Sequence, residues 1–331
     1  MAGRRRKKSG GRSYAWRYRG RIVACVFVEV IIICALVIMI GWNKGVKEWF
    51  EQFEQPVLKE VDISGINSPN AILMQARGGK ILGEINGEAQ IYPASMTKIM
   101  TVILGIENFD DLDEKITLTD EMFTGLYEQD ATQAGFQPGE EVRVIDLLYG
   151  AMLPSGAECC IALADTISGS EADFAELMNK KARKLGMENT HFCDSTGLHN
   201  PDHYSTVKDI AVLMKYCIKN DTFREIVETS RHSTGVTNIH PDGITYYSTM
   251  FKNLSAPTVT GGKILGGKTG YTSEAGHCLV SFAEIEGREY IFVSAGASGA
   301  DGNTIPHIQD AVTVYNRVGA EIEEKMNNNN K

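Results

Sequence analysis

Three extended, largely apolar runs follow one another in residues 261–298, near the C-terminus of this chain of 331 residues. Glu286-Gly287-Arg288 separates the last two runs, as a tight turn does in an antiparallel hairpin. Two further runs lie far upstream, in residues 70–86, on either side of Gly78-Gly79, which is typical of a two-residue hairpin turn. Because strand signals lie at both ends of the region, the sequence predicts one sheet assembled from N-terminal and C-terminal strands.

Helical signals fill the long stretch between these strands. Apolar residues recur at helical spacing, Pro154 stops one predicted helix, and Gly186 is typical of the residue after a helix end. The predicted fold class is therefore α+β, an antiparallel sheet from N- and C-terminal strands with an inserted helical block. Helices are predicted over residues 95–108, 144–153, 157–168, 171–185 and 303–325, and surface loops over 119–141.

Residues 22–42 (IVACVFVEVIIICALVIMIGW) form an almost unbroken apolar segment, long enough as a helix to cross a hydrocarbon core of about 30 Å. Glu29 costs about 2.5–3.5 kcal/mol on insertion scales, which the flanking Ile, Val and Leu residues outweigh. Residues 1–21 hold nine basic residues and no acidic one, which predicts a cytoplasmic N-terminus by the positive-inside rule. We expect an uncleaved membrane anchor, and a cleaved signal peptide is the alternative.

These signals divide the chain into five expected regions, with the globular domain on the extracellular side of a cell membrane. Val46, Trp49, Phe50 and Phe53 have helical spacing, which indicates a juxtamembrane stalk. The regions are a basic arm (1–21), a transmembrane anchor (22–42), the stalk (43–61), the globular domain (62–325) and a disordered tail (326–331).

Charge and cysteine content exclude several kinds of site. Beyond residue 21, 24 basic residues stand against 42 acidic ones, a formal charge of −18. Nucleic acids are bound by clustered Lys and Arg, so no nucleic-acid partner is expected. The Cys residues beyond the apolar segment lack the paired spacing of a zinc site, so we expect buried unpaired thiols and no metal. They are Cys159, Cys160, Cys193, Cys217 and Cys278.

Ser95-Met-Thr-Lys98 places a hydroxyl and an amine three residues apart at the start of a predicted buried helix, and hence on one face. A lysine held neutral by desolvation can accept the proton of a nucleophilic serine, and the helix N-terminus favours a developing oxyanion. Alone the pattern is weak, because S-x-x-K occurs about once by chance in a chain of this length. Ser205 and Lys208 form such a second occurrence.

Two further motifs follow Ser95 in the chain. Lys268-Thr269-Gly270 lies on a predicted strand, where the lysine can bind a carboxylate, the threonine adds a hydroxyl donor and the glycine admits a ligand to the backbone. Ser155-Gly156 forms the turn between two predicted helices and offers a third hydroxyl, able to relay a proton.

In the order ASMTK, PSG and KTG, these motifs resemble those of the serine penicillin-binding proteins and β-lactamases. The segments YPASMTKIMT, LLYGAMLPSGAE, DSTGLHNPDHYST and GGKTGYTSEAGHCLV are similar to the D-alanyl-D-alanine carboxypeptidases, the low-molecular-mass branch of peptidase S11 type. The similarity extends from about residue 62 to residue 320 and implies a β-lactamase/transpeptidase-like fold.

The resemblance also implies a role for each motif residue. Ser95 would be the acylated nucleophile, Lys98 its general base and Ser155 the proton relay, whereas Lys268, Thr269 and Gly270 would bind the substrate. The backbone N–H groups of Ser95 and Tyr271 would form the oxyanion hole. The implied reaction is hydrolysis of the terminal D-Ala-D-Ala bond of a peptidoglycan stem peptide through an acyl-enzyme, with β-lactams as covalent inhibitors and without a cofactor.

One position departs from the family pattern. The middle motif is usually Ser-x-Asn, whereas this chain has Ala157 at the third position. The lost amide contact is worth about 1–3 kcal/mol, so we expect slower acylation unless Glu158 or a neighbouring loop compensates. A non-catalytic penicillin-binding scaffold associated with the cell wall is therefore the alternative function.

Two other patterns receive structural interpretations. His199 and His203 have the spacing of a metal-binding pair, but Pro201 indicates a loop, and the resemblance makes this an ordinary structural segment. Glu176 and Asn179 resemble the acidic loop of class A β-lactamases, yet they fall inside a predicted helix. A β-lactamase is therefore the weaker alternative.

Overall fold

The computed structural model of the protein describes residues 30–31, 57–299 and 305–329. The chain divides into two compact units, residues 1–56 and 57–331. Of the predicted arm, anchor and stalk in the first unit, only Val30 and Ile31 are described, and they are helical; the rest of these predictions lies outside the described residues. Within the described ranges, no helix is both long enough and apolar enough to cross a bilayer.

A six-stranded antiparallel sheet forms the centre of the globular unit, in the order β2-β1-β10-β9-β8-β7. β1 pairs with β10, with Asn70 opposite Ala295, so the two ends of the unit meet in one sheet, as predicted. The strands are β1 (Asn70–Gln75), β2 (Ile81–Ile85), β7 (Thr258–Val259), β8 (Gly262–Thr272), β9 (Gly276–Ile285) and β10 (Arg288–Ala297).

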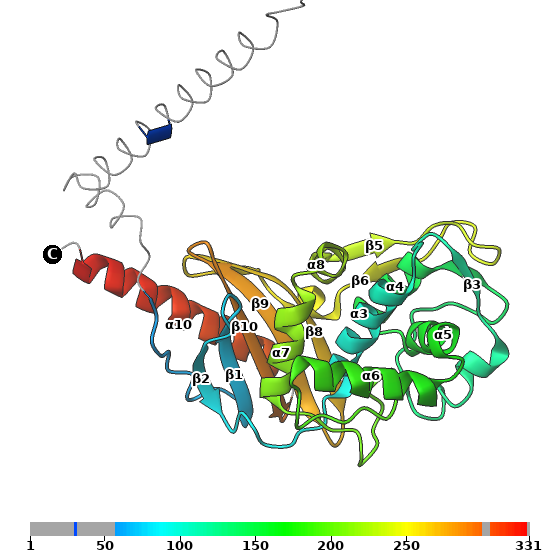
Figure 1. Ribbon diagram of the computed structural model, residues 1–331, viewed down its shortest axis with the longest axis horizontal. Helices are drawn as coiled ribbons and strands as arrows, with labels where there is room; N and C mark the ends of the chain where they lie inside the picture. The colour runs from blue at the N-terminus through cyan, green and yellow to red at the C-terminus, as the bar shows by residue number, and fades with distance from the viewer. Residues whose placement is uncertain (1–29, 32–56, 300–304, 330–331) are drawn as a thin grey trace, which may run out of the picture. The chain divides into compact units, whose positions relative to one another are not determined.

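Both faces of this sheet are buried, because successive side chains of its strands enter two different apolar clusters. In β9, Val280 and Phe282 belong to the larger cluster, whereas Leu279 and Ala283 belong to the smaller one. This is the two-residue period of a strand. The larger cluster joins the sheet to the helical block, and α10 (Pro306–Asn329) closes the smaller one on the other face (Figure 1).

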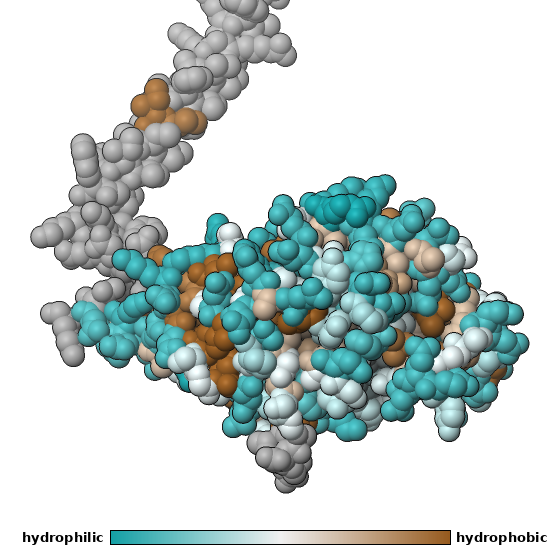
Figure 2. Space-filling model, turned by 90° about the horizontal axis from the view of Figure 1, so that it is seen from below, coloured by the Kyte–Doolittle hydropathy of each residue, from teal (hydrophilic) through white to brown (hydrophobic). Residues whose placement is uncertain are grey.

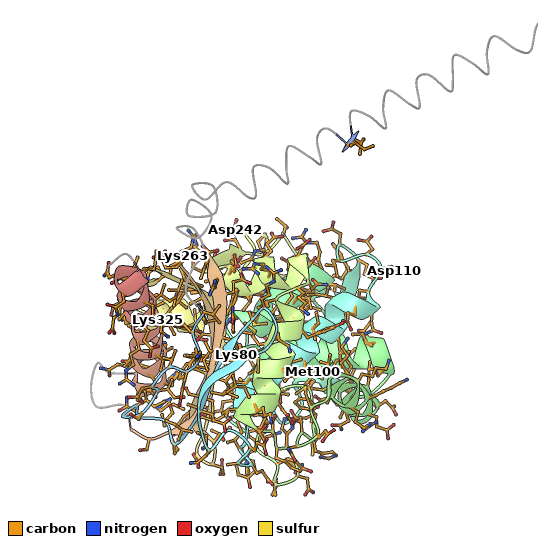
Figure 3. The ribbon with its side chains drawn as sticks, turned by 60° about the vertical axis from the view of Figure 1, so that its left-hand side comes forward. Lys80, Met100, Asp110, Asp242, Lys263 and Lys325 are labelled. Atoms are coloured by element: carbon orange, nitrogen blue, oxygen red, sulfur yellow. The ribbon has the colours of Figure 1, made fainter. Side chains whose placement is uncertain are left out.

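The helical block contains four of the five predicted helices and three more, since the fifth, α10, lies on the other face of the sheet. Its central helix, α3, is buried from Lys98 to Gly105. Figure 3 shows Met100 of α3 within the body, whereas the exposed residues Asp110 and Asp242 lie at its edge. The helices are α3 (Lys98–Asn108), α4 (Val144–Met152), α5 (Ala157–Ser168), α6 (Glu171–Leu185), α7 (Val207–Cys217), α8 (Asp221–Glu228) and α9 (Thr249–Asn253), with short 3-10 helices η1 (Ala94–Thr97) and η2 (Asp120–Phe123).

Two small sheets were not predicted. Each pairs two antiparallel strands of three residues, which is too short for an alternating pattern to be visible in the sequence. They are β3 (Lys115–Thr117) with β4 (Glu141–Arg143), and β5 (Arg231–Ser233) with β6 (Thr245–Tyr247).

The globular unit extends a few residues beyond both predicted ends of the domain. The unit starts at Val57 and not at residue 62, because Leu58 and Val61 pack into the smaller apolar cluster and the Val61 N–H bonds the Leu82 carbonyl. At the other end α10 continues through the predicted tail as far as Asn329. Met326 extends the helix because its side chain packs against the same cluster.

The surface of the unit is mainly hydrophilic, with apolar residues gathered in separate patches on the face in Figure 2. Among the large apolar or aromatic side chains that are exposed is Tyr271, at 60%. It follows directly on the predicted substrate-binding residues of β8.

Candidate active site

Ser95 and Lys98 meet where η1 passes into α3. The Lys98 side chain is buried, and its Nζ donates a hydrogen bond of 3.0 Å to the hydroxyl of half-buried Ser95. Ala94, just before the serine, has a φ of +47°, a left-handed conformation that is uncommon for a residue other than glycine. The spacing therefore brings hydroxyl and amine together as predicted, although Ser95 itself lies in a 3-10 turn.

A second acceptor holds the amine of Lys98. Its Nζ donates to the carbonyl oxygen of Thr196 at 2.7 Å. Burial lowers the pKa of Lys98 below its usual range, while the neighbouring carboxylates of Asp194 and Glu158 act in the opposite direction. A lysine that loses its proton more readily than usual is suited to accept one from the neighbouring serine.

Ser155 and Lys268 form the second serine–lysine pair of the site. Lys268, on β8, is 1% exposed and donates from Nζ to the Ser155 hydroxyl at 2.9 Å. Burial, and then the charge of Lys98, lower the pKa of Lys268 well below its usual range. Ser155 lies between α4 and α5 with a φ of +72°, a backbone conformation that costs a non-glycine residue about 1 kcal/mol or more.

Thr269 has a hydroxyl partner that the sequence did not indicate. Its Oγ1 lies 2.6 Å from Oγ1 of Thr249, the first residue of α9. The N–H of Thr249 in turn bonds the carbonyl of Leu153, two residues before Ser155. Thr249 therefore links β8 to the turn that carries Ser155.

Gly270 allows β8 to run close to the backbone of η1. A Cβ at this position would lie 3.0 Å from the Ser95 nitrogen and 3.2 Å from the Ala94 Cβ, closer than most real contacts. The absence of a side chain thus brings the backbone before Tyr271 against the amide of Ser95. These are the two residues whose N–H groups would form the oxyanion hole that the family resemblance implies.

Ala157, in place of the usual Asn, is the buried first residue of α5, and its N–H donates to the Thr132 carbonyl. Glu158 beside it is also buried, and its Oε1 accepts hydrogen bonds from the N–H groups of Ala134 (2.6 Å) and Gly135 (2.9 Å). Glu158 therefore holds a neighbouring loop against the Ser155 turn, and its charge acts on Lys98 without a hydrogen bond to it.

The five cysteines among the described residues are free thiols, of which four are buried and Cys193 is partly exposed. Cys159 and Cys160 lie in α5, and burial raises the pKa of Cys160 to about 12. The Cys160 thiol donates to the carbonyl of Gly156 at 3.4 Å. Both thiols are part of the core under the Ser155 turn.

The two histidines at metal-binding spacing have different neighbours in the structure. His203 is buried and contacts Thr97 and Asp194, whereas His199 lies 3.9 Å from Glu274. Among the described residues, no cluster of three or more His, Cys, Asp or Glu side chains is arranged to hold a metal ion. Glu176 lies on α6, as predicted.

An antiparallel sheet covered by a helical block, with a serine bonded to a buried lysine beside a Lys-Thr-Gly strand, is the arrangement of the β-lactamase/transpeptidase-like class. The chain belongs to the D-alanyl-D-alanine carboxypeptidase family, whose model matches residues 57–299. The predicted family and fold are thereby confirmed.

Named relatives agree with this assignment. The chain is 35% identical over 231 residues to D-alanyl-D-alanine carboxypeptidase DacF of Bacillus subtilis (strain 168). This alignment covers 69% of this chain and 57% of DacF. It is 33% identical over 262 residues to DacC of Escherichia coli (strain K12), with 72% and 58% covered. The chain therefore spans less than three fifths of the length of these two relatives.

Solved structures show the same fold. The Streptomyces K15 DD-transpeptidase superposes with a TM-score of 0.69 at 28% identity, over 78% of this chain and all of that one. A D-alanyl-D-alanine carboxypeptidase of Mycobacterium tuberculosis H37Rv gives the same TM-score at 22% identity, over 80% of this chain and 96% of that one.

Proposed function

We propose that this protein is a serine-type D-Ala-D-Ala carboxypeptidase that removes the terminal D-alanine from peptidoglycan stem peptides. The observation that carries the proposal is the hydrogen bond from the buried Lys98 Nζ to the hydroxyl of half-buried Ser95, with Lys268 and Ser155 forming a second pair beside it. Membership of the carboxypeptidase family supports the choice of reaction.

In the first step the Ser95 oxygen attacks the carbonyl carbon between the two D-alanines, and its proton passes to Lys98. The N–H groups of Ser95 and Tyr271 stabilise the negative oxygen that forms. The C–N bond then breaks, the leaving amine takes up a proton through Ser155, and free D-alanine departs from an ester on Ser95.

In the second step water attacks this ester while Lys98 accepts a proton from the water. The shortened peptide leaves as a carboxylic acid, and the Ser95 hydroxyl is restored. Neither step requires a metal or a cofactor. An amine that attacked in place of water would give a transpeptidation product.

Lys268 and Thr269 bind the terminal carboxylate of the substrate. An arriving carboxylate favours the charged form of Lys268, and so offsets the burial that lowers its pKa in the free protein. β-Lactams acylate Ser95 in the same site and serve as covalent inhibitors.

We also propose that residues 22–42 anchor the protein in the cell membrane, with the N-terminus cytoplasmic and the domain from Val57 onwards extracellular. The apolar character of this segment and the basic residues of the arm support this location.

A second candidate, a non-catalytic penicillin-binding scaffold, is favoured by one observation. Ala157 offers no side-chain amide to the substrate or to Lys98, and Glu158 is engaged with the loop at Ala134. A site of this kind would be acylated by a β-lactam without releasing D-alanine at a useful rate.

Labelling with a fluorescent penicillin and D-alanine release from a stem-peptide mimic distinguish the two candidates. We expect one label per chain and D-alanine release in the wild type, and loss of both in Ser95→Ala. Ala157→Asn should raise release about tenfold, because one amide hydrogen bond is worth about 1.4 kcal/mol. Labelling without release would support the scaffold, and absence of labelling would reject both.

A further inference from the structure

A tight turn at residues 194–197 is held by the carboxylate of Asp194. Its Oδ1 accepts three hydrogen bonds of 2.7 Å, from the N–H and hydroxyl of Thr196 and from the N–H of Gly197. The bonds from the N–H groups of Thr196 and Gly197 fix two peptide planes, and with them the directions of the Ser195 and Thr196 carbonyls.

This turn lies directly against the start of α3. The Thr196 carbonyl accepts from Lys98 Nζ at 2.7 Å, and the Ser195 carbonyl accepts from the Thr101 hydroxyl at 2.6 Å. Gly197 has a φ of +80°, and a Cβ there would lie 1.9 Å from the Ala94 carbonyl oxygen. The contact therefore reaches both Lys98 and the residue before Ser95.

His203 joins the turn to the same helix from a second side. Its Nδ1 lies 3.1 Å from Oδ2 of Asp194, and its Nε2 lies 2.8 Å from the hydroxyl of Thr97. The ring is 2% exposed, and Thr97 immediately precedes Lys98. The position of Lys98 relative to the Thr196 carbonyl is thus fixed at both the backbone and the amine.

Asp194 also supplies charge. Burial acts to raise the pKa of Asp194, but hydrogen bonds from His203 and Thr196 lower this pKa to about 2. The Asp194 carboxylate therefore remains ionised at ordinary pH. Glu158, by contrast, has its pKa raised by burial. The ionisable groups that face Lys98 are Glu158, Cys159 and Cys160 on α5, Asp194 on the turn, and Lys268 on β8.

We propose that Asp194 and His203 are positioning residues for the acylation step, which hold Lys98 on the Thr196 carbonyl and tune its basicity where Ala157 supplies no amide. The proposal rests on the proposed function, since it assigns Lys98 the role of base. It gives a catalytic purpose to a segment that the sequence presents as structural.

The test measures the rate of acylation by a fluorescent penicillin between pH 5 and pH 9. Asp194→Asn keeps the shape of the side chain but removes a negative charge near Lys98, which becomes easier to deprotonate. The acid limb of the pH profile should therefore move to lower pH by about 0.5 to 1 unit. If the acid limb of Asp194→Asn coincides with that of the wild type, the charge role of Asp194 is overturned.

Asp209→Asn is the matched control. Asp209 is also a buried carboxylate that fixes a turn, through the N–H of Asn189 and the hydroxyl of Thr190, but it acts on neither Lys98 nor Ser95. We expect its pH profile to match that of the wild type, even if its melting temperature falls. A shift equal to that of Asp194→Asn would show a general structural effect and reject the proposal.

His203→Gln tests separately whether the turn holds Lys98 in position. This variant decides the outcome if Asp194→Asn does not fold. Asp194 keeps its charge, because Thr196 and Gly197 still donate to it and the glutamine amide can donate in place of the ring. The acid limb should therefore stay in place while the limiting acylation rate falls about tenfold, with unchanged affinity of the non-covalent penicillin complex. An unchanged limiting rate in a folded variant would refute the proposal. Wild type that is not acylated at any pH would instead refute the proposed function.

Discussion

Nζ of Lys268 lies 2.9 Å from the hydroxyl oxygen of Ser155, although 113 residues separate the two in the chain. The contact requires Ser155 in a left-handed conformation, with a φ of +72°. The proposed proton relay and a strained backbone therefore coincide in one residue, as is common at functional sites.

This coincidence predicts different effects of two substitutions on activity and stability. Ser155→Ala and Ser155→Gly both remove the hydroxyl, so each should slow acylation by about 10²- to 10⁴-fold. Because glycine adopts a positive φ freely, Ser155→Gly should be more stable to urea than Ser155→Ala by about 1 kcal/mol. Equal unfolding midpoints would mean that the Ser155 backbone carries no strain.

Thr249 predicts an effect on substrate binding. Thr249→Val removes the hydroxyl partner of Thr269, 2.6 Å away, and should raise KM for the stem-peptide mimic about fivefold to tenfold, with a smaller effect on kcat. Thr249→Ser should restore the wild-type value. Thr245→Val, which breaks the exposed hydroxyl pair with Ser233, is the control and should leave KM unchanged. A KM that rises equally in this control would contradict a role for Thr249 in binding.

Gly270 predicts a loss of transition-state stabilisation. In Gly270→Ala the new Cβ would lie 3.0 Å from the Ser95 nitrogen, so β8 must move away from η1 and the two oxyanion donors separate. We expect kcat to fall by about 10²- to 10³-fold, the cost of one lost donor. Gly87→Ala, whose Cβ would meet only the flexible side chain of Glu84, is the control. Full activity of Gly270→Ala would rule out the proposed oxyanion hole.

The sheet was predictable because its signals are local. Leu279 and Val280 of β9 enter opposite clusters, so both faces of the strand are apolar and it stands out in the sequence as one largely apolar run. The turn at Gly78 and Gly79, where both residues have a positive φ, is equally local. The pair of β5 and β6 was missed because three residues contain too little of a two-residue period.

The site was predictable only where its contacts are local in the sequence. Ser95 and Lys98 are three residues apart, so their contact follows from one helical turn. His203 meets Thr97 across 106 positions, and Thr249 meets Thr269 across the fold. No short pattern encodes such contacts, so these supporting residues had to come from the structure.

The buried lysines predict how stability depends on pH. Burial lowers the pKa of Lys98 in the folded state below its ordinary value of 10.5, so between those two values the unfolded chain binds more protons. Stability should therefore rise with pH across this window, by up to about 1.4 kcal/mol per pH unit for each lysine. Lys98→Met removes one such group, and its stability curve should be flatter than that of the wild type.

Urea unfolding at pH 7, 8 and 9 measures this difference. The control is Lys208→Met, because Lys208 lies at the surface and its hydrogen bond with Glu88 raises its pKa. Lys208 remains protonated in both states over this range, so its replacement should leave the pH slope unchanged. Parallel curves for wild type and Lys98→Met would mean that Lys98 is charged in the folded protein, and it could not then act as the base that Ser95 requires.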